Sequence, residues 1–378
     1  MDIISRDKCV VTGSKNLEEI YRFIDFPVHQ GTTNAPFEED LRMDLIFDIC
    51  KESGMIQVRN LVPEPVLYNQ EHSRSIGGTW QRHHKKFADF LRKYEPCKVF
   101  EIGGGIGFLE TFYNNGKYTP VPWIILEPNA EPIEGCHAEY ERGFFNESYS
   151  IKSEYDTLVF SHLFEHIYKP YEFMSHLSAE IAIGKKMVFS VPDMEAMLNN
   201  HQTNTLNFEH CYYAAEPYVD YMLTKNGFEI LEKKKYEGHS IFYSAERRKT
   251  VSKDYQLKYL YEKNLKVFQK FIDDYKAFVN SVNEKLVTEK PEYVFLFGAH
   301  LFSQFLLGFG LHEKNIKAIL DNDKAKHGRR LQGSNLICKS PEVLRGIKAP
   351  VVIIRAGTYQ EEIKKGLFAV NKNVIILE

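Results

Sequence analysis

The sequence predicts an α/β protein whose core is a Rossmann-like, doubly wound sheet of mainly parallel strands. Three observations lead to this prediction. Short apolar segments alternate with amphipathic helical segments between residues 79 and 247. A glycine-rich turn follows an apolar segment in KVFEIGGGIGF, residues 98–108. A second, shorter alternation fills residues 291–378 and indicates a smaller Rossmann-like domain there.

The expected elements follow from the periodicity of the apolar residues. In the core they are a helix over 79–94, a strand over 98–102, a helix over 107–115, strands over 122–128 and 155–162, a helix over 169–181, a strand over 185–192, a helix over 215–228 and a hairpin over 229–247. A long charged helix over 252–287 precedes three further strands, at 292–300, 316–323 and 349–357. Apolar strands separated by helices indicate a sheet that is covered on both faces.

Four regions follow one another along the chain. Residues 1–70 contain short mixed segments and turn residues, which predict a small, irregular N-terminal domain. Residues 71–250 form the α/β core, residues 251–290 a helical linker, and residues 291–378 the C-terminal Rossmann-like domain.

The composition is typical of a folded protein with several domains. The chain has 378 residues, of which 43% are hydrophobic and 26% charged, and its formal net charge is -3. With so little net charge and no long basic run, we expect a small-molecule ligand and no nucleic-acid partner. Without a signal-like leader or a membrane-length apolar stretch, we expect no membrane association and a cytoplasmic location. Six scattered cysteines fit a reducing compartment, and the oligomeric state stays open.

The glycine-rich turn indicates a bound ligand, because glycines let the backbone approach it closely. Its spacing is Gly103-x-Gly105-x-Gly107. Phe108 occupies the position where the dinucleotide fingerprint would require another glycine, which weakens a dinucleotide interpretation.

Acidic residues at two strand ends favour S-adenosylmethionine as the ligand. Glu101 would repel a pyrophosphate but attract the cationic amino-acid end of S-adenosylmethionine. Glu127, followed by Pro128, ends the next strand, where a carboxylate can accept hydrogen bonds from both ribose hydroxyls. Ser161 and His162 end a later strand and are expected to face the adenosine or methyl group. Exposed strand-end charges without a ligand are the alternative.

The core motifs resemble those of a known enzyme class. FEIGGGIGFLE, IILEPN, LVFSHLFEHIYKPYEF, MVFSVP and LTKNGFEIL resemble the successive motifs of class I S-adenosylmethionine-dependent methyltransferases. More narrowly, the chain resembles the three-domain C-methyltransferases of nucleotide-activated deoxysugars, in which a zinc-binding N-terminal domain precedes the core and a Rossmann-like domain follows it. CKESGMIQV, FGAHLFSQFLLGFG and ILDNDKAKHGRRLQG extend this resemblance toward both ends of the chain.

The zinc site that this resemblance implies is incomplete. The family has two C-x-x-C pairs, and four thiolates at that spacing bind zinc tetrahedrally. Here the pairs read CVVT, with Cys9 and Thr12, and CKES, with Cys50 and Ser53. Hydroxyls are poor zinc ligands, so we expect no structural zinc, although a mixed site of the two cysteines and a histidine such as His29 stays open.

The segment NFEHCYY supplies the main catalytic candidates. Methyl transfer to oxygen or carbon needs a base for the acceptor proton, and histidine is the usual one. In the sugar C-methyltransferases the matching segment resembles Y-H-E-H; here Asn207 and Phe208 replace its first two residues, and Glu209 and His210 remain. Since the tyrosine is missing, we predict O-methylation with His210 as base and Glu209 as its orienting partner.

Further site residues come from neighbouring segments. In SHLFEH, Glu165 and His166 are placed to orient one another, and His166 is a further catalytic candidate or else a helix-start histidine bonded to the backbone. Tyr212 is a candidate to replace the missing tyrosine. The residues expected to bind substrate are Asn207, Tyr213 and His239.

A segment that precedes the core contributes further predicted site residues. HSRSIGGTWQRHH, with Ser73, Ser75, Trp80 and His83, resembles a family segment that closes over the cofactor, although a helix cap with a packed tryptophan looks similar.

The C-terminal domain has only Gly298 in its first turn, so no intact dinucleotide site is expected there. Its loop residues Asp321, Asn322, Lys324 and Lys326 either receive part of a nucleotide or sugar or form a solvated charged loop.

The leading functional prediction is S-adenosylmethionine-dependent methylation of a small polar acceptor, namely a hydroxyl of a nucleotide-activated or phosphorylated sugar. C-methylation of a keto sugar is the nearest alternative. A catalytically inactive binding or assembly module comes next, and a dehydrogenase is disfavoured by Phe108 and Glu101.

Overall fold

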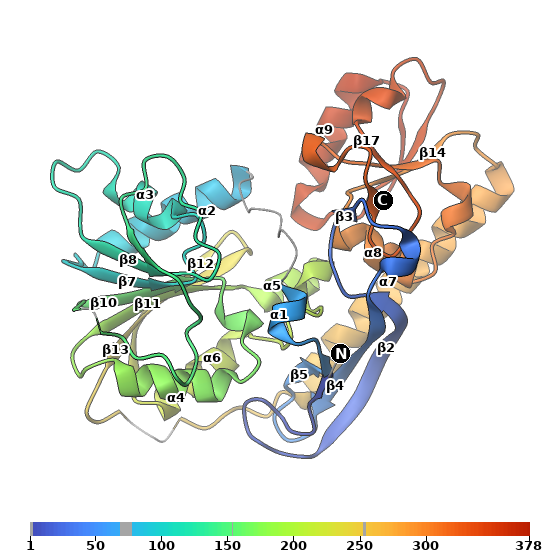
Figure 1. Cartoon of the computed structure of the whole chain (residues 1–378). Helices are drawn as coiled ribbons and strands as arrows, with labels where there is room; N and C mark the ends of the chain where they lie inside the picture. The colour runs from blue at the N-terminus through green and yellow to red at the C-terminus, as the bar shows by residue number, and fades with distance from the viewer. Residues whose placement is uncertain (1–2, 69–77, 153, 252–254) are drawn as a thin grey trace.

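The computed structural model describes residues 3–68, 78–152, 154–251 and 255–378. A central α/β part stands on the left of Figure 1, a C-terminal α/β part at the upper right, and the N-terminal strands below it beside the long helix α7. The segment with Ser73 and Ser75 lies outside the described residues.

A seven-stranded sheet forms the central part, with the order β12-β13-β11-β10-β7-β8-β9. Its strands are β7 (Val99–Ile102), β8 (Trp123–Leu126), β9 (Glu139–Glu141), β10 (Thr157–Ser161), β11 (Lys186–Pro192), β12 (Phe228–Tyr236) and β13 (Ser240–Arg247). All neighbouring strands from β11 to β9 are parallel, and only β13 runs antiparallel to both of its neighbours. The predicted doubly wound, mainly parallel sheet is confirmed.

Helices cover both faces of this sheet. Successive residues of a strand point to opposite faces, so apolar side chains on each face need their own layer of helices. Val99 belongs to the apolar cluster of α2 (Gly78–Arg92) and α3 (Phe108–Asn114). The next residue, Phe100, belongs to the cluster that includes α4 (Pro170–Glu180) and α6 (Glu216–Lys225).

The strand order reverses between β7 and β10, since β8 and β9 continue on one side and β11 on the other. In open α/β sheets, ligands bind outside the carboxyl ends of the strands at such a switch point. The glycine-rich turn follows β7 and His162 follows β10, so both stand at this position.

The N-terminal region is more regular than the sequence suggests. β2 (Leu17–Pro27), β4 (Arg42–Cys50) and β5 (Ile56–Val58) form an antiparallel sheet, and β1 (Ile4–Ser5) pairs with β6 (Asn60–Leu61) before the short helix α1 (Glu64–Leu67). The expectation of an irregular region is wrong here. Register shifts in the β2 and β4 pair interrupt the simple alternation of polar and apolar residues that identifies a strand.

The C-terminal part contains a five-stranded parallel sheet in the order β17-β15-β14-β18-β19. The three predicted strands are β14 (Val294–Phe297), β15 (Ala318–Leu320) and β18 (Val351–Ile353). The short outer strands β17 (Cys338–Lys339) and β19 (Ile375–Leu377) were not predicted, and α8 (Leu301–Gly308) and α9 (Gln360–Val370) complete the unit.

The N-terminal strands pack against the C-terminal part. β3 (Thr32–Thr33) pairs with β16 (Arg330–Leu331), although most of the chain lies between them. The Phe305 ring of α8 lies 5.1 Å from the Phe23 ring and 4.9 Å from the Phe26 ring of β2. Apolar residues of all three parts therefore belong to one continuous core.

The long helix α7 spans Tyr261–Glu289 and begins later than the predicted 252–287. Residues 255–260 are not helical, and the start of the helix lies against the backbone of Gly54, where a side chain would collide with the Leu260 carbonyl group. The Asn264 side chain then donates a hydrogen bond to the Gly54 carbonyl, 2.9 Å away. A further helix of the central part, α5 (Met194–Asn199), follows β11.

No helix within the described ranges has both the length and the apolar character needed to cross a bilayer.

Candidate active site

The glycine-rich turn has the backbone conformation that its sequence predicts. Gly103, Gly105 and Gly107 have φ angles of 68°, 54° and 87°, in the left-handed region that side chains disfavour. A side chain at position 107 would also collide with the Cys136 thiol and would lie 2.8 Å from the Tyr140 hydroxyl. No atom lies within 4 Å of a Cβ placed on Gly105, so this residue faces open space.

Glu127 is directly beside this turn. Its Oε2 accepts a hydrogen bond from the Gly105 N–H at 3.1 Å, and its Oε1 accepts one from the Asn129 N–H at 3.1 Å. A carboxylate has about four acceptor positions, so it retains capacity for ribose hydroxyls while it holds the turn. Pro128 follows within the same loop.

Glu101 lies beneath the turn and is buried. Its Oε2 accepts a hydrogen bond of 2.7 Å from the Trp123 indole, and a Cβ on Gly104 would lie 2.8 Å from the Glu101 carboxyl carbon. Burial raises the pKa of Glu101 to about 8. Its carboxyl group thus supports the turn from below.

The segment after β10 brings polar groups to the neighbouring position. The Ser161 hydroxyl oxygen is buried and has no hydrogen-bond partner among the described residues. His162 has a φ of 49°, which turns the chain sharply as it leaves the sheet, and Leu163 then packs against Gly103.

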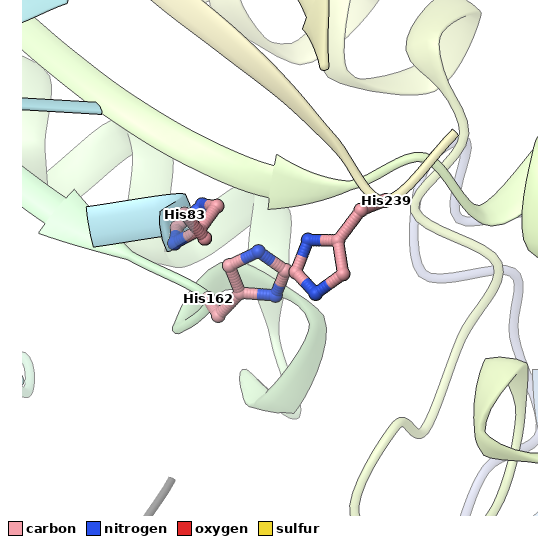
Figure 2. Close-up of side chains that lie close together, drawn as sticks. All are labelled: His83, His162 and His239. Atoms are coloured by element: carbon pink, nitrogen blue, oxygen red, sulfur yellow. The ribbon is translucent and has the colours of Figure 1, made fainter. Parts of the chain in front are cut away.

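Three imidazoles converge at this edge of the sheet, and we call them the triple-histidine cluster: His83 of α2, His162 after β10 and His239 in the turn between β12 and β13 (Figure 2). Each offers one ring nitrogen, and the three nitrogens lie within 4.8 Å of one another. The Trp80 ring contacts all three imidazoles, at 4.8 to 5.5 Å between centroids. Burial lowers the pKa of each histidine, that of His239 to about 4, so the rings are neutral at pH 7.

A second group, the Glu165 cluster, consists of Glu165, His166 and His210, whose ligand atoms also lie within 4.8 Å of one another. Glu165 is fully buried in the short 3₁₀ turn Phe164–His166, and neither of its carboxylate oxygens has a hydrogen-bond partner among the described residues. Its Oε1 lies 3.2 Å from His162 Nδ1, without the alignment of a hydrogen bond. This contact connects the two clusters.

The hydrogen bonds of His210 define its tautomer. Nδ1 of His210 contacts the Asn204 carbonyl oxygen, which can only accept, so Nδ1 carries the proton and Nε2 carries the lone pair. Burial lowers the pKa of His210, which keeps the ring neutral at pH 7. His166 packs its ring 4.8 Å from that of His210, and its Nδ1 lies 3.1 Å from the Tyr68 hydroxyl.

The remaining predicted residues lie around these clusters. The Asn207 side chain accepts hydrogen bonds from the Glu209 and His210 N–H groups, at 2.8 and 3.2 Å, and so shapes the turn that presents His210. Burial raises the pKa of Glu209 to about 7. Tyr212 is buried, and its hydroxyl donates to the Phe164 carbonyl at 2.5 Å, which fixes the Glu165 turn. Tyr213 is buried, and its N–H donates to the Ile56 carbonyl of β5.

The four positions of the incomplete zinc motif do come together. The Cys9 sulfur lies 3.4 Å from the Ser53 hydroxyl, and the Cys50 sulfur 4.0 Å from the Thr12 hydroxyl. His29 instead lies at the boundary with the C-terminal part, where its carbonyl accepts a hydrogen bond from Gln304. No metal-binding group of three that includes these cysteines occurs among the described residues.

In the C-terminal loop, Asp321 is occupied by contacts within the protein. It accepts a hydrogen bond from the Ala299 N–H at 2.9 Å and pairs with Lys326 at 3.0 Å. Lys324 lies on the surface in a short 3₁₀ turn.

Sequence reasoning did not recognise His83, Glu165 and Tyr68 as members of one site. The segments HSRSIGGTWQRHH and SHLFEH contain His83 and Glu165, but local patterns give no information on which distant segments meet. Tyr68 had no signal of its own, since it follows the single turn of α1.

Comparison with known proteins agrees with this α/β arrangement. Residues 72–233 match the family model described as a methyltransferase domain. This part of the chain is a methyltransferase domain of Rossmann-like fold, and the protein is a methyltransferase enzyme. The match covers less than half of the chain and does not identify the acceptor. A search of curated proteins finds no match by sequence.

Solved structures with a similar chain trace are also methyltransferases. Magnesium protoporphyrin IX methyltransferase from Synechocystis PCC 6803, with bound SAH, has 14% identity and a TM-score of 0.36 over 47% of this chain and 90% of its own. A putative S-adenosylmethionine-dependent methyltransferase from Listeria monocytogenes has 13% identity and a TM-score of 0.36, over 46% and 100%. The N-methyltransferase NodS from Bradyrhizobium japonicum WM9 has 13% identity and a TM-score of 0.34, over 47% and 100%.

Proposed function

We propose that this enzyme transfers the methyl group of S-adenosylmethionine to a hydroxyl of a small polar acceptor, a nucleotide-activated or phosphorylated sugar. The observation that carries the proposal is the Glu165 cluster beside the switch point of the sheet. There a buried carboxylate without a hydrogen-bond partner among the described residues stands next to the neutral imidazole of His210.

The residues at the switch point fit S-adenosylmethionine. Glu127 borders the turn and has acceptor capacity for a ribose, Gly105 faces open space, and the Ser161 oxygen lacks a partner among the described residues. When bound, the cofactor supplies an electrophilic methyl group on a sulfonium. The buried Glu101 stabilises the turn through Trp123, so we assign it a supporting role in cofactor binding.

His210 is the proposed base. Its Nε2 holds the lone pair because Nδ1 donates to the Asn204 carbonyl, and it would accept the proton of the acceptor hydroxyl as the oxygen gains the methyl group. The imidazolium formed in this step would be stabilised by the nearby carboxylate of Glu165, as the aspartate stabilises the imidazolium of a catalytic triad. His166 and Tyr68 would line the same place, and Tyr212 would hold the Glu165 turn.

The sugar class rests on the resemblance of the flanking segments to the nucleotide-sugar family. Contacts between the parts of the chain are consistent with an acceptor site that several segments share. Gln30, which follows β2, donates a hydrogen bond of 3.2 Å to Asn207, the residue that shapes the His210 turn. Asn207 would then affect the substrate site through His210.

The first test is calorimetric titration with S-adenosylmethionine and S-adenosylhomocysteine, with NAD as the control. Saturable binding of the first two alone is expected, and a preference for NAD would overturn the cofactor assignment. Nucleotide sugars are then screened by mass spectrometry for a gain of one methyl group. Cofactor binding without turnover on any sugar or phosphorylated sugar would contradict methyl transfer to this class and favour a binding module.

A second test separates O-methylation from C-methylation. A keto sugar that is deprotonated at carbon exchanges that proton with deuterated water even without the methyl donor, whereas an O-methyltransferase leaves its carbon-bound protons in place. We expect no exchange. His210→Ala should abolish turnover and leave the affinity for S-adenosylhomocysteine unchanged, and retained turnover would remove His210 from the role of base.

A further inference from the structure

We propose that the triple-histidine cluster of His83, His162 and His239 is a binding site for a divalent transition-metal ion of the zinc type. The three residues come from α2, from the loop after β10 and from the β12–β13 turn, so only the folded chain assembles them. The sequence led us to expect no metal, because that expectation considered only the C-x-x-C positions and a histidine such as His29 beside them.

The geometry suits three nitrogen ligands. Figure 2 shows the His162 ring between those of His83 and His239, and the ring centroids are 4.9 to 5.4 Å apart. Zinc–nitrogen bonds of about 2.0–2.1 Å in a tetrahedron require nitrogens roughly 3.3 Å apart. The observed separations, within 4.8 Å, are larger, so small rotations of the rings would close the site around an ion.

The protonation state also suits metal binding. A histidine ligand must be neutral, and burial together with the neighbouring imidazoles keeps the pKa of His83 and of His162 well below the ordinary value. Burial lowers the pKa of His239 as well. No ring therefore has to lose a proton at pH 7 before it binds an ion.

The surroundings of the rings resemble those of metal ligands. The Ser190 hydroxyl lies 3.0 Å from His83 Nε2, and the Ser240 hydroxyl lies 2.8 Å from His162 Nε2 and 2.6 Å from His239 Nδ1. In metal sites, hydrogen-bond partners behind the imidazoles orient the rings, and these hydroxyls can act in the same way. Trp80 covers the group with an apolar ring.

A buried ring nitrogen that lacks a hydrogen-bond partner among the described residues supports the metal site independently of the ring geometry. His83 is completely buried, its Nε2 is bound to Ser190, and its Nδ1 has no hydrogen-bond partner among the described residues. A buried polar atom without a partner costs about 1–3 kcal/mol. Coordination of an ion by this nitrogen would remove that cost. Three protein ligands would leave one position for water or another oxygen ligand, as in catalytic zinc sites.

The test uses the full chain after removal of metals with a chelator, titrated with Co²⁺ as a coloured substitute for Zn²⁺. We expect one ion per chain, the visible bands of a tetrahedral cobalt site, and no near-ultraviolet band from cobalt–thiolate bonds. Elemental analysis after reconstitution with Zn²⁺ should give the same stoichiometry. No binding at stoichiometric concentrations, or a thiolate band, would overturn the proposal.

Variants locate the ion. His239→Ala changes a turn, and His162→Asn retains a side chain that tolerates the positive φ at this position, so either variant can be used if the other fails to fold. Each should weaken Co²⁺ binding by at least about tenfold. The exposed His312→Ala and the thiol variant Cys9→Ser should bind as the parent does. Unchanged binding by the two cluster variants, or loss of binding in His210→Ala alone, would place the ion elsewhere and overturn the proposal.

These measurements need neither methyl donor nor acceptor. Failure to bind metal would thus leave the proposed methyl transfer intact, and failure of methyl transfer would leave the metal site intact.

Discussion

Nδ1 of His162 lies 3.2 Å from Oε1 of Glu165, and this contact connects the triple-histidine cluster to the Glu165 cluster at the carboxyl edge of the sheet. His162 is neutral because burial lowers its pKa, so it offers the carboxylate a dipole rather than a full opposite charge. A fully buried carboxylate in these surroundings is costly for the stability of the fold. An unfavourable burial of this kind, at the edge of the sheet where ligands bind, is typical of a functional residue.

Glu165→Gln should therefore separate activity from stability. The amide cannot stabilise an imidazolium on His210, so we expect turnover to fall by about 10²–10⁴-fold with unchanged S-adenosylhomocysteine affinity. The same change removes an unpaired buried charge, so Tm should stay equal or rise. Steady-state kinetics and thermal denaturation check both results. The exposed Glu172→Gln on α4 is the matched control, and a Glu165 variant that loses Tm but keeps its turnover would show a purely structural role.

The pKa of Glu209 gives a pH-dependent prediction. Burial raises it to about 7 in the folded protein, against 4.5 for the ordinary carboxyl, so between these values the folded state binds more protons than the unfolded state. Its contribution to stability is thus present at low pH and is lost as the pH rises through about 7. Glu209→Gln should raise Tm relative to the parent at pH 8 and change it little at pH 5.

Comparison of the two proteins at each pH cancels other groups, such as Glu101 with its pKa of about 8. The exposed Glu284→Gln on α7 should show no pH-dependent difference. If the Tm difference between Glu209→Gln and the parent is the same at both pH values, the pKa of Glu209 is not raised. If the carboxylate orients His210, the parent's turnover should also rise with pH through about 7, and the variant's should not.

Gly107→Ala should damage the glycine-rich turn. The added methyl group would collide with the Cys136 thiol at a φ of 87°, so we expect a loss of roughly 1–3 kcal/mol in the free energy of unfolding and weaker S-adenosylhomocysteine binding. Gly116→Ala is the matched control, because it has a φ of 75° but no atom within 4 Å of the new Cβ. Urea denaturation and calorimetry measure the two effects. Equal losses in both variants would show that backbone strain alone, and not the collision, determines the result.

The sequence predicted those parts of the site that depend on local order. The glycine-rich turn follows one strand and Glu127 follows the next strand along the chain, so both positions could be read from the sequence. In the structure the Gly105 N–H donates a hydrogen bond to the Glu127 carboxylate. Glu101 shows what a closer analysis could have given. Val99 and Glu101 are two residues apart in one strand and share a face, and Val99 packs under α2 and α3. The Glu101 side chain therefore points into that layer, toward Trp123.

The rest depends on which distant segments meet, and periodicity contains no information on that. Long stretches of chain, of about equal length, separate His83 from His162 and His162 from His239. No local sequence pattern relates the three residues. The pairing of β3 with β16 is of the same kind, since it joins two-residue strands too short to show any alternation.

The ion pair of Arg330 and Asp40 beside this pairing supports the last prediction. Both side chains are buried, 8% and 1% exposed, and their atoms are 2.6 Å apart. Arg330 also donates hydrogen bonds to the carbonyls of Ala35 and Pro36, both at 2.6 Å. Arg330→Met would leave the Asp40 carboxylate buried without its cation, so we expect a loss of about 3–5 kcal/mol in the free energy of unfolding. The double variant with Asp40→Asn should regain a large part of that loss, because the uncompensated charge is gone.

Arg345→Met is the control, since Arg345 and its partner Glu342 are 65% and 56% exposed, and an exposed pair contributes at most about 1 kcal/mol. Urea denaturation of the four proteins measures these differences. If Arg330→Met cost no more than Arg345→Met, this ion pair would not be what holds the N-terminal strands to the C-terminal part, and the aromatic contacts of Phe305 would have to do so.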